Sequence, residues 1–557
     1  MKLCVESNEV RIECSGMELL KLKTALNNRL GGMLKAEKSA LVFPLSSLSL
    51  VQDLIEGGEK SPEIAETLRM YELHAEARRC ALRIVASETV ENVSEEWLQR
   101  LDPAQSYAVS AMTVPNLLGL CLFDEQGSGK TVMTIAAFNA LKDANVVDAM
   151  IVVCPKTMMS EWPKDIEKFL PGKYEVAVAE GDRREKFLTA LKDFAVLVTN
   201  YEGVESMQVA LTATASQRRY LLVVDESYYV KNTESLRSDA AKRLRANCAR
   251  CYVLCGTPAP NSPYDLVNQF NLADKGFTFA GFKKSKDLDG DRDKISDLID
   301  TRGTLIRRMK TEILEDIPDK NFHIVGIPLT GRQAFLYEKA RSELELELKA
   351  LDNISFRRKL ATYFQRRAVL LQICSNPSAI DPTITDVPVK YEYLDALMAN
   401  LISKGRKVIL WSFYKNSLDD LAARYAEYNP VRIDGSVDVA TRRVAVRLFQ
   451  ENPERMVFIG NPAAAGAGVT LHAAYDAVYV SYSNQAAHYL QSLDRIHRRG
   501  QTAKEVNYYL LVCQDTIEET EVVRLRGKEL QQHSILGDHI SWPASLDEAL
   551  KELCGHD

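Results

Sequence analysis

Short apolar runs that alternate with helical segments constrain the fold of this chain more than any other feature. Between residues 96 and 275, such runs occupy positions 150–154, 195–198, 221–224 and 252–255. A run that is apolar at every position is typical of a strand buried on both faces, and regular alternation with helices indicates a parallel sheet. We therefore predict an α/β lobe with helices on both faces over residues 96–275.

A second series of apolar runs follows in the last third of the chain, at 408–412, 431–434, 457–460, 477–481 and 507–512. It predicts a second parallel-sheet lobe over residues 386–530. Residues 276–385 gain charge and lose strand-like runs, which predicts a helical insertion. Residues 1–95 combine alternating stretches with helical patterns, so we expect a small α+β module with a helical connector, and residues 531–557 form a tail.

The bulk properties agree with several folded units. The chain has 557 residues, of which 46% are hydrophobic and 26% charged, whereas one hydrophobic core stops growing at about 250 to 300 residues. No apolar run approaches the ~20 residues of a membrane-spanning helix, and residues 1–10 lack the apolar core of a signal peptide. We expect a cytoplasmic protein without a membrane partner. With a net charge of −6, any attraction to nucleic acid has to be local.

Three of the eleven cysteines, Cys248, Cys251 and Cys255, lie close together in the sequence. A structural zinc site needs four ligands, and no second cysteine or histidine pair is near them. We therefore favour buried strand cysteines over a metal site.

A glycine-containing loop precedes a good helical pattern at residues 132–141. The loop ends in Gly127-Ser128-Gly129-Lys130-Thr131. Such a loop lets backbone N–H groups approach phosphate oxygens at the N-terminus of the following helix. In that arrangement Lys130 would reach the β- and γ-phosphates of ATP, and the Thr131 hydroxyl would bind Mg²⁺. The usual first glycine of a phosphate loop is replaced by Asp124.

Two carboxylates, Asp225 and Glu226, follow the apolar run 221–224. Open α/β sheets bind ligands at the carboxyl ends of their strands. With a phosphate loop upstream in the same sheet, we expect Asp225 to bind Mg²⁺ and Glu226 to orient and deprotonate the attacking water.

These segments together resemble the Swi/Snf-related ATPases of helicase superfamily two. The loop from Asp124 to Thr131 is similar to that family's D-E-x-G-x-G-K-T loop, which also lacks the first glycine, and residues 491–501 are similar to its Q-x-x-D-R-x-H-R-x-G-Q motif. The resemblance covers roughly residues 96–530. It implies an α/β fold of two RecA-like parallel-sheet lobes in tandem, as in P-loop NTPases. It also implies an ATP site made of Gln105, Asp124, Glu125, Gln126, Gly127, Ser128, Gly129, Lys130, Thr131 and Gln491.

The resemblance also implies residues that contact DNA or couple its movement to hydrolysis. In the first lobe these are Pro155, Ser160, Trp162, Thr257 and Asn261. In the second they are Asp434, Gly435, Gly466 and Gly468. Tyr228 stands where the family commonly has histidine, and Ala463 where it has arginine.

The distance between motifs implies a motor. The phosphate loop and the arginines Arg495 and Arg498 lie over 350 residues apart, so ATP on one lobe meets these arginines only when the lobes close. Arginine suits this catalytic role because its planar, permanently charged fork stabilises the charge of the transferred phosphoryl group. We expect an ATP- and Mg²⁺-dependent translocase that grips double-stranded DNA by its backbone, with little sequence specificity.

Three alternatives remain at this point. The chain could separate strands as a DNA or RNA helicase. It could be a nucleotide-gated scaffold in a repair, recombination or defence complex, or a remodeller that strips or moves protein bound to DNA and is given its target by residues 1–95. Residues 1–95 could also bind a protein partner. The compact size suggests a bacterial or phage source. Two basic clusters could add phosphate contacts: Arg307, Arg308 and Lys310, and Arg357, Arg358, Lys359, Arg366 and Arg367. The second cluster could instead pair with its acidic neighbours at 343, 345 and 347.

Overall fold

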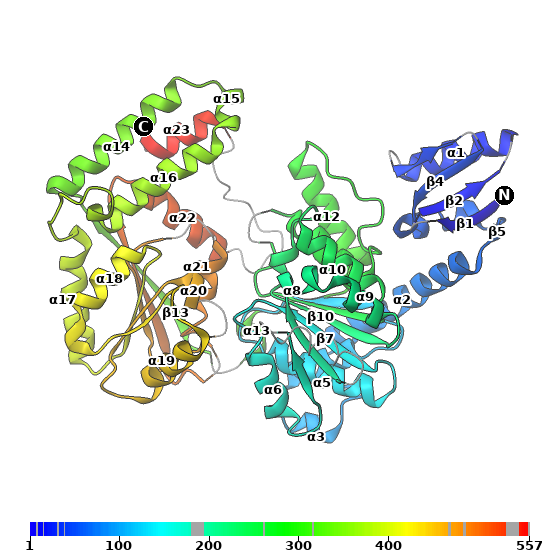
Figure 1. The fold of residues 1–557 in the computed structure, drawn as a ribbon, viewed down its shortest axis with the longest axis horizontal. Helices are drawn as coiled ribbons and strands as arrows, with labels where there is room; N and C mark the ends of the chain where they lie inside the picture. Colours follow the sequence, from blue (N-terminus) through cyan, green and yellow to red (C-terminus); the bar gives the residue numbers. More distant parts are fainter. Residues whose placement is uncertain are drawn as a thin grey trace. The chain divides into compact units, whose positions relative to one another are not determined.

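The computed structural model describes the whole chain except residues 7, 8, 15, 31, 32, 38, 180–193, 260, 261, 315, 316, 466–468, 483–485, 499, 531–544 and 555–557. The chain divides into two compact units, Met1–Met309 and Lys310–Asp557. Each unit is built on a parallel sheet with helices packed against it (Figure 1). In the described part of the chain, no helix is both long and apolar enough to cross a bilayer.

The first unit begins with a five-stranded sheet of order β3-β4-β2-β1-β5. Its strands are β1 (Lys2–Glu6), β2 (Glu9–Glu13), β3 (Lys35–Ala36), β4 (Ala40–Pro44) and β5 (Glu59–Lys60). Helix α1 (Gly16–Leu30) buries Leu26 and Leu30 in a core with Val10, Ile12 and Phe43. The α+β module predicted from the sequence is therefore a small sheet with its own core.

The long helix α2 (Pro62–Ala86) connects this module to the first lobe through polar contacts with the lobe's backbone. The Nδ1 atom of His74 accepts a hydrogen bond from the Leu118 N–H (3.2 Å), and Arg78 donates to the carbonyl oxygens of Asp300 (2.6 Å) and Gly303 (2.7 Å). Burial beside three arginines lowers the pKa of His74 to about 3, so its imidazole is neutral.

The first lobe is a seven-stranded parallel sheet of order β12-β6-β11-β10-β7-β9-β8. The strands are β6 (Gly119–Leu122), β7 (Ala149–Cys154), β8 (Val176–Val178), β9 (Val196–Asn200), β10 (Tyr220–Asp225), β11 (Arg250–Leu254) and β12 (Leu305–Ile306). The helices are α3 (Glu95–Leu98), α4 (Pro103–Met112), α5 (Lys130–Asp143), α6 (Glu161–Phe169), α8 (Tyr201–Ser206), α9 (Gln208–Ala215), α10 (Leu236–Ala246), α11 (Asp265–Asp274) and α12 (Leu288–Arg302).

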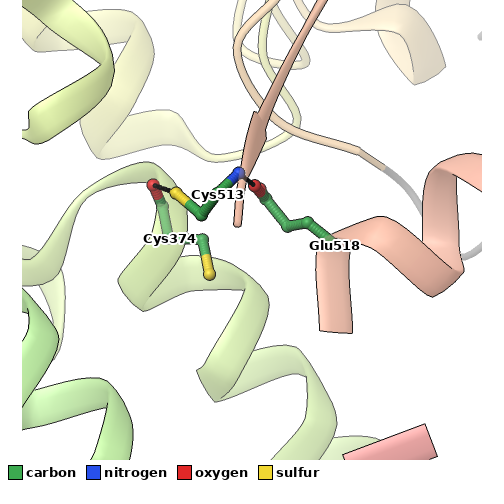
Figure 2. Close-up of side chains that lie close together, drawn as sticks. All are labelled: Cys374, Cys513 and Glu518. Carbon is green, nitrogen blue, oxygen red and sulfur yellow. Dashed lines mark hydrogen bonds between the residues drawn. The ribbon is translucent and has the colours of Figure 1, made fainter. Parts of the chain in front are cut away.

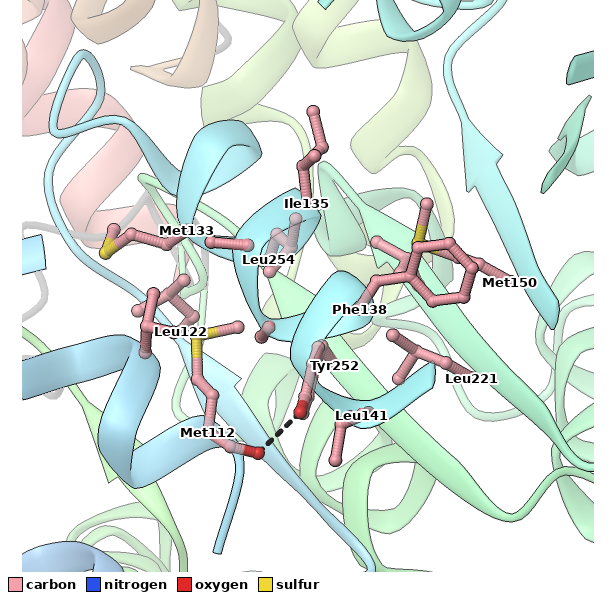
Figure 3. Close-up of a cluster of buried hydrophobic side chains, with 14 of the residues drawn as sticks. Met112, Leu122, Met133, Ile135, Phe138, Leu141, Met150, Leu221, Tyr252 and Leu254 are labelled. Carbon is pink, nitrogen blue, oxygen red and sulfur yellow. Dashed lines mark hydrogen bonds between the residues drawn. The ribbon is translucent and has the colours of Figure 1, made fainter. Parts of the chain in front are cut away.

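The core of this lobe lies where α5 packs on the sheet (Figure 3). Met133, Phe138 and Leu141 of α5 are almost wholly buried, and burial of each such side chain contributes about 1.5 to 3 kcal/mol. The Tyr252 hydroxyl donates to the Met112 carbonyl (2.5 Å) and so ties strand β11 to helix α4. This packing fixes α5 and therefore the loop that begins it.

The second lobe is a six-stranded parallel sheet of order β13-β18-β17-β14-β16-β15. The strands are β13 (Asp319–Ile327), β14 (Val408–Trp411), β15 (Val431–Ile433), β16 (Val457–Gly460), β17 (Asp476–Tyr479) and β18 (Glu505–Cys513). The helices are α13 (Lys310–Ile313), α14 (Gly331–Lys349), α15 (Asn353–Arg358), α16 (Leu360–Ser375), α17 (Val389–Ser403), α18 (Lys415–Arg424), α19 (Val439–Glu451), α20 (Pro462–Ala465), α21 (Ala486–Leu493), α22 (Ile517–Leu530) and α23 (Leu546–Cys554).

The structure differs from the purely helical insertion expected at residues 276–385. This segment divides between the units after Met309, and it contributes an edge strand to each lobe, β12 beside β6 and β13 beside β18. The sequence pattern missed both strands for a physical reason. Strand β12 has two residues, and only Ile327 of β13 is buried, so neither forms the fully buried apolar run that marks the other strands.

A buried polar cluster ties the helices of this segment to the second lobe. Figure 2 shows Cys374 at the end of α16, Cys513 at the end of β18 and Glu518 at the start of α22. The Cys513 thiol donates to the Cys374 carbonyl, and the Glu518 carboxylate accepts from the Cys513 N–H (2.8 Å) and the Lys390 ammonium (2.7 Å). Three candidate metal-ligand atoms thus lie within 4.8 Å of one another, but the carboxylate is already engaged.

The cysteines near β11 are buried, as predicted for strand positions. Cys251 lies in β11, between Cys248 and Cys255. Burial raises the pKa of the Cys248 thiol to about 11 and those of Cys251 and Cys255 to about 12, so these thiols are protonated and unreactive.

Candidate nucleotide site and nucleic-acid contacts

The glycine loop joins β6 to α5 and needs glycine at two positions. Gly127 and Gly129 have φ values of +91° and +90°, in the left-handed region that a side chain disfavours. A Cβ atom on Gly129 would also collide with the side-chain amide of Gln105. The backbone of this loop can therefore approach an anion at the N-terminus of α5.

The Gln105 side chain links the loop to the start of α4. Its amide nitrogen donates to the Ser128 carbonyl (2.9 Å), and its amide oxygen accepts from the Asp102 N–H (3.1 Å), which closes the capping box of α4. The predicted Gln105 therefore contacts the loop, and its amide is held at both ends.

Asp124 is fully buried and is paired with Arg308. The Arg308 guanidinium contacts both carboxylate oxygens, and the Arg308 N–H donates to Oδ1 (2.9 Å). The Asp124 carbonyl in turn accepts a hydrogen bond from the Lys130 ammonium (2.7 Å). Asp124, which replaces the usual glycine, therefore contacts Arg308 through its side chain and Lys130 through its backbone carbonyl.

The carboxylates lie at the carboxyl end of β10. The Asp225 side chain accepts hydrogen bonds from the Trp162 indole (2.9 Å) and from the Glu226 N–H (2.9 Å), and its carbonyl accepts from the Tyr201 hydroxyl (2.5 Å). Burial raises the pKa of Asp225, while the Trp162 hydrogen bond and the charge of Lys130 oppose that rise. Glu226 has φ +51°, which turns the chain sharply after the strand.

The loop and the carboxylates meet at one edge of the sheet. The Gln126 amide donates to the Glu226 carboxylate (2.8 Å), and Gly256, just after β11, packs so closely on Gln126 that a Cβ there would lie 3.2 Å from the Gln126 Cβ. These contacts join the segments that follow β6, β10 and β11, which are neighbours or next neighbours in the sheet.

This arrangement fits a nucleoside triphosphate and its metal ion. The loop offers backbone N–H groups at two left-handed glycines, and the buried Ser128 hydroxyl has no hydrogen-bond partner among the described residues. Thr131, at the first turn of α5, is half-buried, and Asp225 supplies a hard oxygen of the kind that Mg²⁺ prefers.

The predicted coupling residues of the first lobe differ in how far they are buried. Pro155 is buried, and Ser160 is half-buried at the N-terminal end of α6. The Thr257 hydroxyl is buried without a partner among the described residues. Trp162 is fully buried and so is not placed to contact DNA; instead it links the start of α6 to Asp225. Asn261 lies outside the described residues.

In the second lobe, the arginines follow α21. Arg495 is 3% exposed and donates to the carbonyl oxygens of Gln491 (2.7 Å) and Val469 (2.8 Å). Arg498 is half-buried and donates to the Val469 carbonyl at 3.4 Å. Arg498 is therefore more accessible than Arg495. Gln491 is also buried, and its amide nitrogen has no partner among the described residues.

Lys310 fixes the segment that carries these arginines. Its ammonium is fully buried and donates to Asp494 (2.5 Å) and to the His497 carbonyl (2.7 Å). The His497 ring also contacts the Pro318 carbonyl (2.9 Å).

Asp434 shapes a turn rather than offering a charge to phosphate. Its carboxylate accepts from the N–H (2.8 Å) and hydroxyl (2.5 Å) of Ser436 and pairs with Arg432. The Ser436 hydroxyl is the largest of the contacts that lower the pKa of Asp434. Gly435 in this turn is exposed, so its backbone N–H is the group that an anion could reach. Gly466 and Gly468 lie outside the described residues.

Several basic residues that could have bound phosphate are instead ion-paired. Arg308 and Lys310 are buried as described, Arg366 pairs with Glu347 (2.7 Å), and Arg367 pairs with Glu521 and Glu552. Arg357, Arg358 and Lys359 are exposed and remain available to a polyanion.

Sequence reasoning treated Arg308 and Lys310 as candidate phosphate contacts and did not identify the buried acids with which they pair. Both are basic residues in a charged stretch, and nothing in their spacing names the buried acids that they contact. Tyr201 follows β9 directly, and this position at a strand end brings its hydroxyl to the Asp225 carbonyl.

Comparison with known proteins identifies the family. A model described as the SNF2-related domain matches residues 35–379, more than half of the chain, and one described as the helicase conserved C-terminal domain matches residues 389–500. YwqA of Bacillus subtilis is 26% identical over 94% of this chain and 58% of its own length. The mouse chromodomain-helicase-DNA-binding protein 1-like is 28% identical over 74% of this chain and 47% of its own.

Other similar proteins share the same region. The chromatin-remodeling complex ATPase ISW1 of Saccharomyces cerevisiae is 26% identical over 75% of this chain and 39% of its own. A solved structure of the Sulfolobus solfataricus SWI2/SNF2 ATPase core in complex with dsDNA aligns with 82% of this chain and 97% of its own, at 23% identity and a TM-score of 0.37. This chain spans 39 to 58% of the length of the three relatives. The family models decide the assignment: the chain belongs to the SNF2-related family of helicase-like ATPases.

Proposed function

We propose that this chain is an ATP-driven motor that moves along double-stranded DNA by coupling hydrolysis to closure of its two lobes. The Gln126–Glu226 hydrogen bond carries the proposal, because it joins the phosphate loop to the carboxylate pair at one sheet edge. Membership of a family whose members include a named ATPase and a named DNA-binding protein supports it.

Each residue at the site has a chemical task in this proposal. Lys130 binds the β- and γ-phosphates, while Thr131 and Asp225 hold Mg²⁺, which would neutralise phosphate charge. Glu226 orients the attacking water and accepts its proton. The Trp162 indole keeps the Asp225 carboxylate in one orientation.

The second lobe supplies positive charge. Arg498 is the arginine that we expect to stabilise the transferred phosphoryl group, since Arg495 is held by backbone carbonyls within its own lobe. DNA would be held through its phosphates by exposed backbone N–H groups such as that of Gly435. Contacts of this kind position the duplex and carry little sequence information.

Steady-state ATP hydrolysis tests the proposal. The rate would be measured without nucleic acid and with duplex DNA, single-stranded DNA or RNA, for the wild type, Lys130→Ala and Glu226→Gln. We expect duplex DNA to stimulate the wild type most strongly and each variant to lose on the order of 10²-fold or more. A rate indifferent to DNA, or normal hydrolysis by both variants, would refute the motor.

Two further assays separate translocation from strand separation. Displacement of a third strand from a DNA triplex, without release of a strand from forked DNA, is the result expected of a duplex translocase. Release of the forked strand would instead establish a helicase. Stimulation by a protein that binds residues 1–95, with no effect of DNA, would establish a nucleotide-gated scaffold.

A further inference from the structure

Two basic residues that the sequence suggested as phosphate contacts are instead anchored to the two halves of the proposed ATPase site. Arg308 is 7% exposed and is anchored in the first unit. Its backbone N–H and Nε both donate to Asp124 Oδ1 (2.9 and 3.1 Å), and its Nη1 donates to the Ala104 carbonyl (2.5 Å). The Arg308 carbonyl accepts from the Glu125 N–H (3.0 Å). Arg308 is thus fixed to the start of the phosphate loop through both its side chain and its backbone.

Lys310 is anchored in the second unit. Its side chain is fully buried, and its ammonium contacts Asp494 and the His497 carbonyl at 2.5 and 2.7 Å. Asp494 and His497 immediately precede Arg495 and Arg498, respectively, in the sequence. Lys310 is thus fixed to the segment that carries both arginines.

One residue, Met309, separates the two anchors, and the boundary between the units falls directly after it. Two steps along the backbone span at most about 7 Å. We propose that residues 308–310 form a tether that couples the phosphate loop to the arginine segment, with Arg308 and Lys310 acting as positioning residues. This proposal rests on the proposed function, because it assigns the tether a task in lobe closure.

The anchors suit this task because both are buried charges with an opposite charge in contact. Withdrawing either charge from its partner would leave an unpaired charge inside the protein, so both anchors resist displacement. The two anchors are joined along the chain through the backbone of Met309 alone. A movement of the arginine segment therefore acts on Arg308, and through it on Asp124, whose carbonyl binds Lys130.

Lengthening the tether tests the proposal while leaving both ion pairs intact. Insertion of Gly-Gly after Met309 adds up to about 7 Å of chain. The matched control carries Gly-Gly after Gly172, an exposed turn residue in the same unit with no atom near its Cβ position. The dissociation constant of a fluorescent ATP analogue, and kcat and KM with saturating duplex DNA, are measured for both variants and the wild type.

We expect the tether insertion to lower kcat with DNA on the order of 10- to 100-fold. Its nucleotide affinity should stay within about twofold of the control, because the first unit is unchanged. A tether variant that hydrolyses ATP as fast as the Gly172 control would overturn the tether and leave the motor standing. A wild type that binds ATP but ignores DNA would overturn the proposed function, and the tether with it.

Discussion

Removing the Arg308 guanidinium should destabilise the first unit by an amount that follows from its contacts. Asp124 is fully buried, and its carboxylate accepts from three groups of Arg308: the backbone N–H, Nε and Nη2. Arg308→Met deletes two of the three. Each hydrogen bond to a charged group contributes about 1.5 to 3 kcal/mol, and stranding one charge of a buried pair costs about 3 to 5 kcal/mol. We therefore expect a loss of about 4 kcal/mol in the free energy of unfolding.

Urea unfolding followed by tryptophan fluorescence measures this loss, because Trp97 and Trp162 are buried in the first unit. A double-mutant cycle with Asp124→Asn gives the decisive number. The asparagine removes the stranded charge, so the double variant should be more stable than the sum of the single losses predicts, by about 2 kcal/mol. A loss below about 1 kcal/mol for Arg308→Met, the value of an exposed pair, or strict additivity of the two changes, would refute the reasoning.

Three other predictions follow from single contacts. Gly129→Ala places a Cβ against Gln105 at φ +90°, so the KM for ATP should rise about tenfold. The control Gly172→Ala should leave the KM unchanged, and equal KM values for the two variants would contradict this prediction. Trp162→Phe removes the indole donor to Asp225, and the Mg²⁺ concentration for half-maximal hydrolysis should rise about 10- to 100-fold; an unchanged Mg²⁺ dependence would show that Asp225 needs no such support. His74 has a folded pKa of about 3, below its ordinary value of 6.5, so its contribution to stability is complete above pH 6.5 and falls as the pH drops. Between pH 7.5 and 5.5 the wild type should lose about 1.4 kcal/mol more than His74→Gln in urea unfolding, and parallel losses would exclude this histidine as the cause.

Most of the first lobe's chemistry was predictable because local sequence encodes it. The strand ahead of Asp225 is buried along its whole length and therefore apolar at each position. The loop before α5 has two positions, Gly127 and Gly129, in the left-handed conformation. This local backbone conformation favours glycine there. Features of this kind depend on neighbours in sequence, which is why motif and periodicity located them.

The edge strands and the polar contacts depended on tertiary structure. Strand β13 buries only Ile327 and so lacks the fully buried apolar run of the other strands, although it pairs with β18 along nine residues. Trp162, which family resemblance associates with DNA, is buried against Asp225, because α6 turns that face of its first turn towards the sheet.

By itself the sequence determined the fold class, the family and the residue types of the candidate nucleotide site, since burial pattern and loop conformation are local properties. Only the tertiary structure decided which charges meet. Arg308 and Asp124 are 184 positions apart, as are Lys310 and Asp494. A buried charge needs a partner, but sequence spacing does not name one. The fold does so by bringing strand ends and helix starts together, and it thereby turns two basic residues of a charged stretch into anchors on either side of Met309.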